Sequence, residues 1–359
     1  MLKQLENFFS GKRVLILGLG REGRSTLDIL KNIDCTIGIA DKNLSPTTEL
    51  EQYELYLGDN YLDCLDKFDI IMKSPGIALL DMVSDEIKAK ITSQTDLLLR
   101  FRSNTLIGIT GTKGKSTTSS LTCHILKECG KNAMLIGNIG VPVLDNLAEG
   151  ESEVAVIEMS SHQLEFTTAS PHIAVMTNIY PEHLDHYNGF KGYVAAKLNI
   201  IRHQTGCDYF ICNAQQDFDA YYNFSNTCAT VIKVCLDGGK GDEEIIAAAG
   251  ANERLKGLHN RQNVCLAATA ARCVGVSDSD ILAAVENFKG IENRMEPIGE
   301  YYGIKFYNDA IATIPHAVEC AVEALGDVDT LIFGGMDRGI DYSGFEKYLE
   351  SSKIKNLIG

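Results

Sequence analysis

The sequence predicts an α/β protein built on parallel sheets, and two observations carry this prediction. Short runs of β-branched and aliphatic residues alternate with helical patterns, and two of these runs lead through a glycine turn into a helix. The first run is RVLILG at residues 13–18, and the second is LIGITG at 106–111. Strands joined by helices pair in parallel, because the helix returns the chain to the starting edge of the sheet. Further strands are expected at 35–41, 70–77, 154–159, 173–179, 209–214, 304–310 and 330–335.

Composition indicates a globular protein whose partners are small molecules. The 359 residues are 45% hydrophobic and 23% charged, a length sufficient for two or three domains. The formal net charge of -15 argues against nucleic acid and against an anionic membrane, because both need a basic face. The cysteines lack metal-binding spacing, and the chain has no signal-peptide pattern and no apolar run of the ~18 residues that a membrane span requires. We therefore expect a cytoplasmic protein with reduced thiols.

Three domains are expected from the order of these elements. Residues 1–97 form a Rossmann-like unit, residues 98–297 a central unit that starts near the second glycine turn, and residues 298–359 a third unit. The stretch 292–309 is interpreted as a hinge before the third unit. That unit has room for two strands and two helices and stops in a strand pattern, IKNLIG, so we expect an incomplete C-terminal domain whose parallel sheet is poorly covered.

The first glycine turn has the form of a dinucleotide-binding fingerprint. Gly18, Gly20 and Gly23 follow a strand and open a helix, and Asp41 ends the next strand. Glycine permits the tight turn and lets a pyrophosphate approach the helix N-terminus. SPGI at residues 74–77 follows another strand and is expected at the same carboxyl edge of the sheet. Three interpretations stay open at this point: a nicotinamide cofactor, another nucleotide diphosphate, and a tight turn without a ligand.

The second glycine turn is stronger evidence for phosphate binding. In GTKGKST, residues 111–117, backbone N–H groups could cradle phosphate, Lys115 could reach the β and γ oxygens, and the hydroxyl of Ser116 or Thr117 could hold Mg2+. The spacing differs from the usual P-loop, because Ile109 stands where its first glycine is expected. The alternative is a chance glycine turn at the start of a helix.

Three later residues carry chemistry only in combination. Glu158 ends a buried strand and suits Mg2+ as an oxygen donor, whereas His183 is a less usual ligand. Taken alone, Glu158 is better explained as a solvated strand end, and His183 and His186 as ordinary loop histidines. Lys197 lies in the apolar helical stretch YVAAKLNII, where a lysine usually extends its amine to water.

Taken together, several motifs resemble the Mur ligases, in the same order and over nearly the whole chain. They are GTKGKST, IEMSSHQL, NIYPEHLDHY, AAKLNI, KGLHNRQNVCLAA and NRMEPI. The resemblance implies an ATP-dependent, amide-bond-forming ligase of peptidoglycan precursor synthesis, closest to the member that adds D-glutamate to UDP-N-acetylmuramoyl-L-alanine through an acyl phosphate. It also implies that the Rossmann-like domain binds UDP, so a nicotinamide cofactor becomes a minor interpretation. The implied UDP-substrate residues are Gly18, Gly20, Arg21, Glu22, Asp41, Lys42, Ser74, Pro75, Gly76 and Asn138.

The resemblance also implies the ATP and metal sites of the central domain. Lys115, His183 and Lys197 are the implied catalytic residues, and Lys197 resembles the lysine that the family carbamylates. ATP and two Mg2+ ions are the implied cofactors, and a monomer is expected. The implied ATP-binding residues are Gly111, Thr112, Lys113, Gly114, Lys115, Ser116, Thr117, Asn260, Asn263, Arg294 and Asp309. The implied metal ligands are Ser116, Thr117, Glu158, His183 and the carbamate of Lys197.

Some positions depart from the family pattern. Asn293 stands where the hinge motif commonly has His, and Ala310, Ile311 and Ile314 stand where Ser, Lys and Asn are common. The third domain is also shorter than the pattern requires, and the missing part would include much of the amino-acid site. Two alternatives therefore stay open: another Mur-type or folylpolyglutamate-type amide ligase, and a non-catalytic relative that binds a nucleotide or a UDP-sugar.

Overall fold

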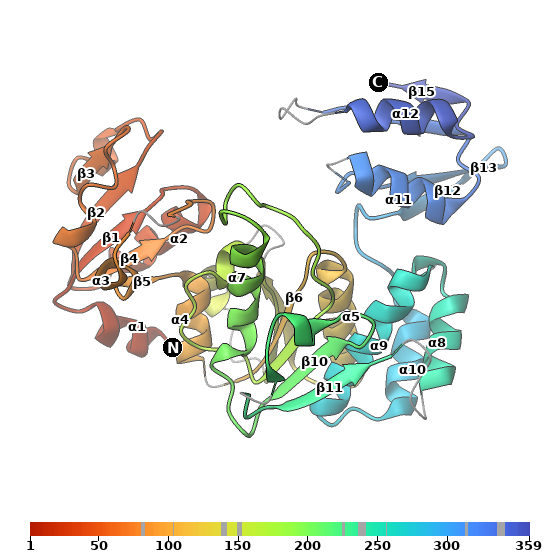
Figure 1. Ribbon diagram of the computed structural model, residues 1–359, viewed down its shortest axis with the longest axis horizontal. Helices are drawn as coiled ribbons and strands as arrows, with labels where there is room; N and C mark the ends of the chain where they lie inside the picture. The colour runs from red at the N-terminus through yellow and green to blue at the C-terminus, as the bar shows by residue number, and fades with distance from the viewer. Residues whose placement is uncertain are drawn as a thin grey trace.

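Three parts follow one another along the chain in the computed structural model (Figure 1). The N-terminal part is red to orange, the central part yellow to cyan, and the C-terminal part blue, joined to the central part by a single chain segment. The fold class is α/β with mostly parallel sheets, as the sequence predicts. The structure describes residues 1–79, 83–102, 104–137, 142–148, 153–224, 227–235, 242–255, 257–312, 315–335 and 342–359.

The N-terminal part is a five-stranded parallel sheet in the order β3-β2-β1-β4-β5. Side chains of its central strand alternate between two cores, because successive residues of a strand point to opposite faces. Val14 and Ile16 pack with α1, α2 and α4, whereas Leu15 and Leu17 face the other side. The strands are β1 (Arg13–Leu17), β2 (Thr36–Asp41), β3 (Glu54–Leu57), β4 (Ile70–Lys73) and β5 (Ile91–Thr92), and the helices are α1 (Leu2–Phe9), α2 (Arg21–Leu30), α3 (Asp85–Lys88) and α4 (Gln94–Phe101).

The central part is a six-stranded parallel sheet in the order β11-β10-β9-β6-β8-β7. Ile107 and Ile109 of β6 pack with α5, α8, α9 and α10, whereas Leu106 packs with α4 and α7 on the opposite face. The strands are β6 (Thr105–Thr110), β7 (Ala133–Gly137), β8 (Val154–Glu158), β9 (Ile173–Met176), β10 (Tyr209–Asn213) and β11 (Thr230–Val234). The helices are α5 (Lys115–Glu128), α6 (Ser161–Leu164), α7 (Phe190–Arg202), α8 (Asp242–Ala251), α9 (Leu258–Cys273) and α10 (Asp278–Asn287).

The register of the central sheet brings three strand ends to one edge. Ile109 of β6 pairs with Glu158 of β8, and Thr110 of β6 pairs with Met176 of β9. The residues that follow these strands therefore lie next to one another at the carboxyl edge, where ligands of parallel sheets bind.

The C-terminal part contains two separate pairs of strands. β12 (Glu296–Tyr301) and β13 (Ile304–Asn308) are antiparallel, so the stretch interpreted from sequence as a hinge is largely a hairpin. Its two-residue turn is Tyr302–Gly303, both at positive φ, which matches the twist of the paired strands. β14 (Thr330–Ile332) and β15 (Asn356–Ile358) are parallel. The helices are α11 (Pro315–Leu325) and α12 (Ser343–Ser351). The domain limits expected at residues 97 and 297 stay predictions.

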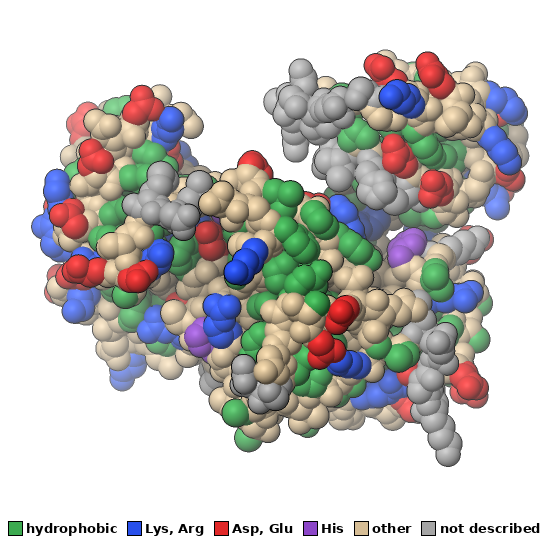
Figure 2. All heavy atoms as spheres, viewed as in Figure 1, with side chains coloured by type: hydrophobic (Ala, Val, Ile, Leu, Met, Phe, Trp, Pro, Cys, Tyr) green, Lys and Arg blue, Asp and Glu red, His purple; other side chains and the backbone are tan. Residues whose placement is uncertain are grey.

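The distribution of surface charge and the state of the cysteines agree with what the composition predicts. On the face drawn in Figure 2, Lys and Arg side chains are interspersed with Asp and Glu. Ten of the eleven cysteines are free thiols. Within the described ranges, every helix is too short or too polar to cross a membrane.

Candidate active site

A loop and a helix start form the centre of the candidate site, at the carboxyl edge of the central sheet. The loop follows β6, and α5 begins at Lys115 with Gly114 as its N-cap residue. Gly111 and Gly114 have φ of 154° and 85°, and a Cβ atom at these positions would overlap the side chains of Thr177 and Asn263, respectively. The first N–H groups of a helix have no partner within it. The start of α5 therefore presents donors that suit phosphate oxygens.

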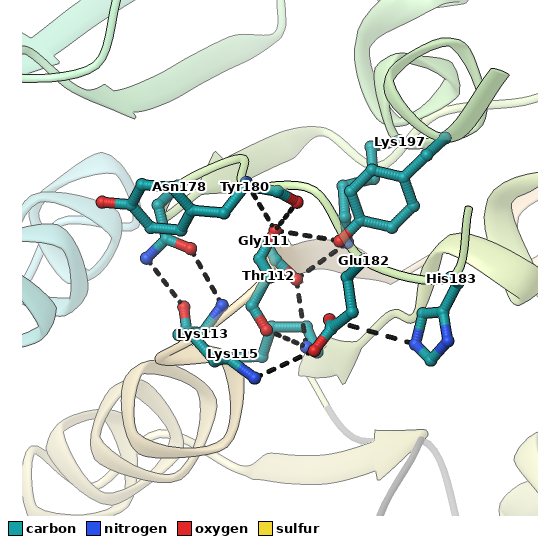
Figure 3. A network of polar contacts seen from close by, with 10 residues as sticks. Gly111, Thr112, Lys113, Lys115, Asn178, Tyr180, Glu182, His183 and Lys197 are labelled. Carbon is teal, nitrogen blue, oxygen red and sulfur yellow. Dashed lines mark hydrogen bonds and ion pairs between the residues drawn. The ribbon is translucent and has the colours of Figure 1, made fainter. Parts of the chain in front are cut away.

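Two residues that follow β9 hold the backbone of this loop. Asn178 Nδ2 donates to the Lys113 carbonyl at 3.0 Å, and the Lys113 N–H donates to Asn178 Oδ1 at 2.8 Å (Figure 3). Thr177 Oγ1 donates to the same carbonyl at 2.6 Å, and the Thr112 N–H donates to the Asn178 carbonyl at 2.9 Å. Neither residue was predicted from the sequence. Their signal was a polar pair directly after a buried strand of the same parallel sheet.

Two lysine amines converge on one oxygen of the loop, the carbonyl of Gly111. Lys115 Nζ donates to the carbonyls of Gly111 and Thr112, both at 3.0 Å, and Lys197 Nζ donates to that of Gly111 at 2.8 Å (Figure 3). Burial lowers the pKa of Lys115, against the raising effect of the Glu158 carboxylate. Burial lowers the pKa of Lys197 much further, and the positive charge of Lys115 lowers it again. Lys197 therefore favours the uncharged amine far more than a lysine in water does.

The side chain of Lys197 does not reach water, so the solvent-extended alternative is wrong. Lys197 is 1% exposed, and its Nζ lies 4.9 Å from the ring centroid of Tyr193, one turn earlier on α7. The hydroxyls of Tyr193 and Thr112 share a hydrogen bond of 2.9 Å, and burial raises the pKa of Tyr193 to about 12. Lys197 is buried because the apolar run of α7 packs this face of the helix onto the sheet.

Glu158 is a buried acceptor and not a solvated strand end. It is 2% exposed, and Oε1 accepts a hydrogen bond from Ser116 Oγ at 3.1 Å, while Oε2 is buried without a partner in the described part of the chain. A buried carboxylate oxygen without a donor is costly, and a hard cation between Glu158 and Ser116 would satisfy it. Thr117, next in the first turn of α5, is also buried.

The protein atoms available to such a cation are few. Among the described residues, no three His, Cys, Asp or Glu side chains are grouped so that they could enclose a metal ion. One carboxylate and one hydroxyl are a fitting set for Mg2+ in a nucleotide site, because this ion keeps several waters and takes further oxygens from the substrate phosphates.

His183 is connected to the loop through Glu182. Glu182 Oε1 accepts from Lys113 Nζ at 2.9 Å, and Glu182 Oε2 lies 3.9 Å from His183 Nε2 (Figure 3). His183 has a φ of 53°, and its ring packs edge-on against that of His162 at a centroid separation of 4.8 Å. About half of the His183 side chain is exposed, so its ring is accessible to a ligand in the site.

The two asparagines predicted to bind ATP, Asn260 and Asn263, lie on α9 beside the loop. Asn263 packs against Gly114, and its Nδ2 donates to Asn260 Oδ1 at 3.2 Å. Both side chains are buried. Helix α9 therefore packs against the start of α5.

Arg294 lies in the segment before β12, and Asp309 directly follows β13. Among the described residues, Arg294 Nε is buried without a partner, and its charge contributes to lowering the pKa of Lys115 after the larger effect of burial. Burial and then Arg294 lower the pKa of His259, a neighbour that the sequence analysis missed. Asp309 accepts the Met295 N–H at 2.9 Å, and burial raises its pKa.

The positions that depart from the family pattern form a local turn. Asn293 has a φ of 58°, and its Oδ1 accepts from Asn308 Nδ2 at 2.7 Å. The Ala310 N–H donates to Asn308 Oδ1, and the Ile311 N–H donates to the Asn293 carbonyl. Asn293 thus joins the segment before β12 to the residues at the end of β13 and after it. Ile314 lies outside the described residues.

A second site is a cavity of about 630 Å³ that is walled by the N-terminal and central parts. Nine of the ten residues predicted for the UDP substrate line it, and the tenth, Asn138, lies outside the described residues. The start of α2 faces the cavity, and Asp41 orders the wall by accepting the N–H groups of Leu19 and Asn43 at 2.8 and 2.9 Å. The lining residues that the sequence analysis missed are Asn43, Tyr61, Ile77, Ala78, Gly137, Pro142, Val143, Ser160 and Gln163.

Comparisons with known proteins match most of the chain. Residues 12–94 match the family model of the Mur ligase MurD-like N-terminal domain, and residues 109–271 match that of the Mur ligase middle domain. A UDP-N-acetylmuramoylalanine--D-glutamate ligase of Ligilactobacillus salivarius is 32% identical over 99% of this chain and 82% of its own length. The protein of the same name from Listeria innocua is 33% identical over 99% of this chain and 83% of its own length.

Solved structures of related fold agree in architecture. A MurF of Acinetobacter baumannii superposes with a TM-score of 0.58 at 18% identity, over 97% of this chain and 77% of that chain. A MurF ligase of Thermotoga maritima in complex with ADP superposes with a TM-score of 0.53 at 18% identity, over 96% of this chain and 79% of that chain. At these identities the likeness establishes the fold alone.

Proposed function

Because the chain belongs to the Mur ligase family, it is an ATP-dependent ligase that forms amide bonds, and we propose that it joins D-glutamate to UDP-N-acetylmuramoyl-L-alanine. The observation that carries this proposal is the name shared by relatives 31–33% identical over nearly the whole chain. The geometry supports it, since a glycine loop at a helix start, which suits phosphate, and a cavity large enough for a nucleotide lie in one chain.

The reaction has two steps, and the loop serves the first. A carboxylate oxygen of the alanine attacks the γ-phosphorus of ATP, the bond to the β-phosphate oxygen breaks, and ADP leaves. The N–H groups at the start of α5 bind the phosphates. The amine of Lys115 then donates its hydrogen bonds to phosphate oxygens in place of the carbonyls of Gly111 and Thr112. Its positive charge offsets the negative charge that develops during transfer.

The second step forms the amide. The amine nitrogen of D-glutamate attacks the acyl carbon, the bond from that carbon to the phosphate oxygen breaks, and inorganic phosphate leaves while the amine loses a proton. Closure of the C-terminal part would bring Arg294 and Asp309 against the nucleotide and exclude water. Exclusion of water protects the acyl phosphate from hydrolysis.

Magnesium belongs to this proposal because the residues fit it. Glu158 Oε2, which lacks a partner in the described part of the chain, and Ser116 Oγ would hold one ion at the β and γ phosphates. The ion would supply charge neutralisation on the transferring phosphoryl group. His183, half-exposed on the far side of Glu182, would hold a second ion.

The carbamate of Lys197 also belongs to the proposal. The uncharged Nζ of Lys197 attacks the carbon of CO2, which forms an N–C bond and releases one proton to solvent. Burial favours the uncharged amine that this step requires. The product is an anion that replaces an amine buried beside Lys115, so the positive charge of Lys115 would stabilise it.

The protein is further proposed to act as a monomer in the cytoplasm. The phosphate loop and the cavity both come from one chain, so a second copy is not required to complete them. Free thiols at ten of the eleven cysteines fit a reducing compartment.

Phosphate release, measured with ATP, UDP-N-acetylmuramoyl-L-alanine and a panel of amino acids, tests the proposed function. D-glutamate should give the largest rate, and mass spectrometry should find the product enlarged by one glutamate. The panel should include L-alanine and meso-diaminopimelate, which other Mur-type ligases would prefer. Preference for another amino acid would contradict the proposed substrate, and no release with any would favour a non-catalytic relative.

A further inference from the structure

The carboxylate of Glu165 lies between the N-terminal and central parts and contacts both. Its Oε2 is 3.2 Å from Lys73 Nζ at the end of β4 and 3.3 Å from His186 Nε2 in the central part. The side chains of Lys73, Glu165 and His186 are 3%, 14% and 10% exposed. One carboxylate oxygen therefore joins a cation at the end of β4 to an imidazole in the turn before α7.

On the N-terminal side, Lys73 lies behind a turn that walls the cavity. Its Nζ is 3.4 and 3.5 Å from the carbonyl oxygens of Ser74 and Pro75, and Ser74 Oγ donates to the Gly18 carbonyl at 2.8 Å. Ser74, Pro75 and Gly18 line the cavity, whereas Lys73 and Glu165 are not among the described residues that do. Lys73 thus supports this wall from outside.

On the central side, His186 belongs to the turn that carries His183. The His186 N–H donates to the His183 carbonyl at 3.2 Å. The ring of His162 packs against both rings, at centroid separations of 4.3 Å from His186 and 4.8 Å from His183. Asn199 of α7 donates to the Glu165 carbonyl at 3.0 Å, so the helix that carries Lys197 also fixes the backbone of Glu165.

We propose that Glu165 is a positioning residue that couples the sugar-nucleotide cavity to the turn bearing His183. The inference rests on the proposed function, which assigns the cavity to the UDP substrate and His183 to the reaction. A buried ion pair contributes little to stability, because desolvation offsets its attraction, but it can specify one arrangement of its neighbours. A ligand that orders the Ser74 turn fixes Lys73, and through Glu165 it fixes His186.

Calorimetry of UDP binding tests the contact between Lys73 and Glu165, which is the part of the proposed coupling on the cavity side. Glu165→Gln and Lys73→Met should each weaken UDP binding by about 5-fold or more, although neither side chain is among the described lining residues. The double variant should bind little worse than either single one, because both remove the same link. Asp242→Asn is the matched control, since Asp242 is 13% exposed and pairs with Arg272 at 2.8 Å between α8 and α9.

Kinetics separate a positioning role from a merely structural one. Glu165→Gln should lower kcat and raise KM for the UDP substrate. Lys73→Met should raise KM with a smaller loss of kcat, because it removes one of the two contacts of Glu165 and keeps the contact with His186. The control should change neither parameter. Unchanged UDP affinity in both Glu165→Gln and Lys73→Met, or an equal loss of affinity in the control, overturns the proposal.

Histidine NMR decides the coupling without any reaction or ligand. In protein labelled with 15N at its eight histidines, Lys73→Met should shift the signals of His183 and His186, assigned with His183→Gln and His186→Gln variants. Signals that stay in place overturn the coupling even if the protein ligates D-glutamate. Shifted signals in a protein that binds no UDP or adds no D-glutamate support the coupling and contradict the proposed function alone.

Discussion

The carboxyl group of Glu22 gives a quantitative prediction about pH and stability. Glu22 lies in the first turn of α2 and lines the cavity, and among the described residues its Oε1 is buried without a hydrogen-bond partner. Burial raises the pKa of Glu22 from 4.5 to about 7, against the lowering effect of Lys73. The folded protein therefore binds a proton here that the unfolded chain releases between about pH 4.5 and 7, so this contribution to stability is present at low pH and lost as pH rises.

Replacing Glu22 with Gln keeps the neutral form at every pH. A pKa raised by about 2.5 units corresponds to about 3.4 kcal/mol above pH 7, of which about 2.5 kcal/mol develops between pH 5 and 8. Because part of the side chain faces the solvent-filled cavity, screening reduces this difference to about 1–2 kcal/mol. Glu22→Gln should therefore stabilise the protein at pH 8 by that much more than at pH 5.

Urea unfolding at both pH values measures this difference, with Glu6→Gln on the exposed side of α1 as the matched control. Contributions that the variant shares with the unaltered protein cancel in this comparison. An ionised Glu22 beside a helix start would also repel a diphosphate, so Glu22→Gln should bind UDP more tightly than the unaltered protein at pH 8 but not at pH 5. Equal stabilisation at the two pH values would refute the reasoning.

Three further predictions concern the phosphate loop, the buried amine and the cavity. Lys115→Ala should reduce ATP-dependent phosphate release by about 100-fold or more with an unchanged far-UV circular dichroism spectrum, and normal release would contradict the phosphate-loop assignment. Lys197→Met replaces a buried amine with an apolar chain of similar length, so it should preserve or raise the urea midpoint and abolish most ligation, with partial recovery in added short carboxylates. Normal ligation by that variant would exclude the carbamate. Calorimetry should detect UDP binding at the cavity and no comparable NAD binding, and the reverse order would exclude the sugar-nucleotide assignment.

The sequence predicted those parts of the site that depend on one strand, one loop and one helix. The turn at 111–117 and the position of Glu158 followed from a strand ending at a known edge of a parallel sheet. Lys197 was harder, because apolar neighbours on a helix do not reveal whether the lysine reaches solvent. Its burial depends on how α7 packs across the sheet, where Tyr193 and the loop occupy the space around the amine.

Contacts between distant segments were not predictable from local patterns. Thr177 and Asn178 are ordinary polar residues in sequence, and their role depends on β9 lying beside β6. Lys73 and Glu165 meet across two sheets, so no spacing within either motif indicates their contact. The antiparallel hairpin was missed because its turn, Tyr302–Gly303, lacks the Asn-Gly or Asp-Gly pair that usually marks such turns.

The order of the central sheet has a consequence for how the protein can be re-engineered. The chain adds β7 and β8 on one side of β6 and then returns to add β9, β10 and β11 on the other. The connection that leaves β6 and the connection that leaves β9 therefore lead to opposite sides of the sheet. The crevice between the carboxyl ends of these two strands is a topological switch point. The location of the glycine loop after β6 is thus a property of connectivity, and the outermost strand, β11, does not border it. A circular permutant that opens the connection between β10 and β11 should keep the loop and its lysines in place while losing cooperativity at the sheet edge.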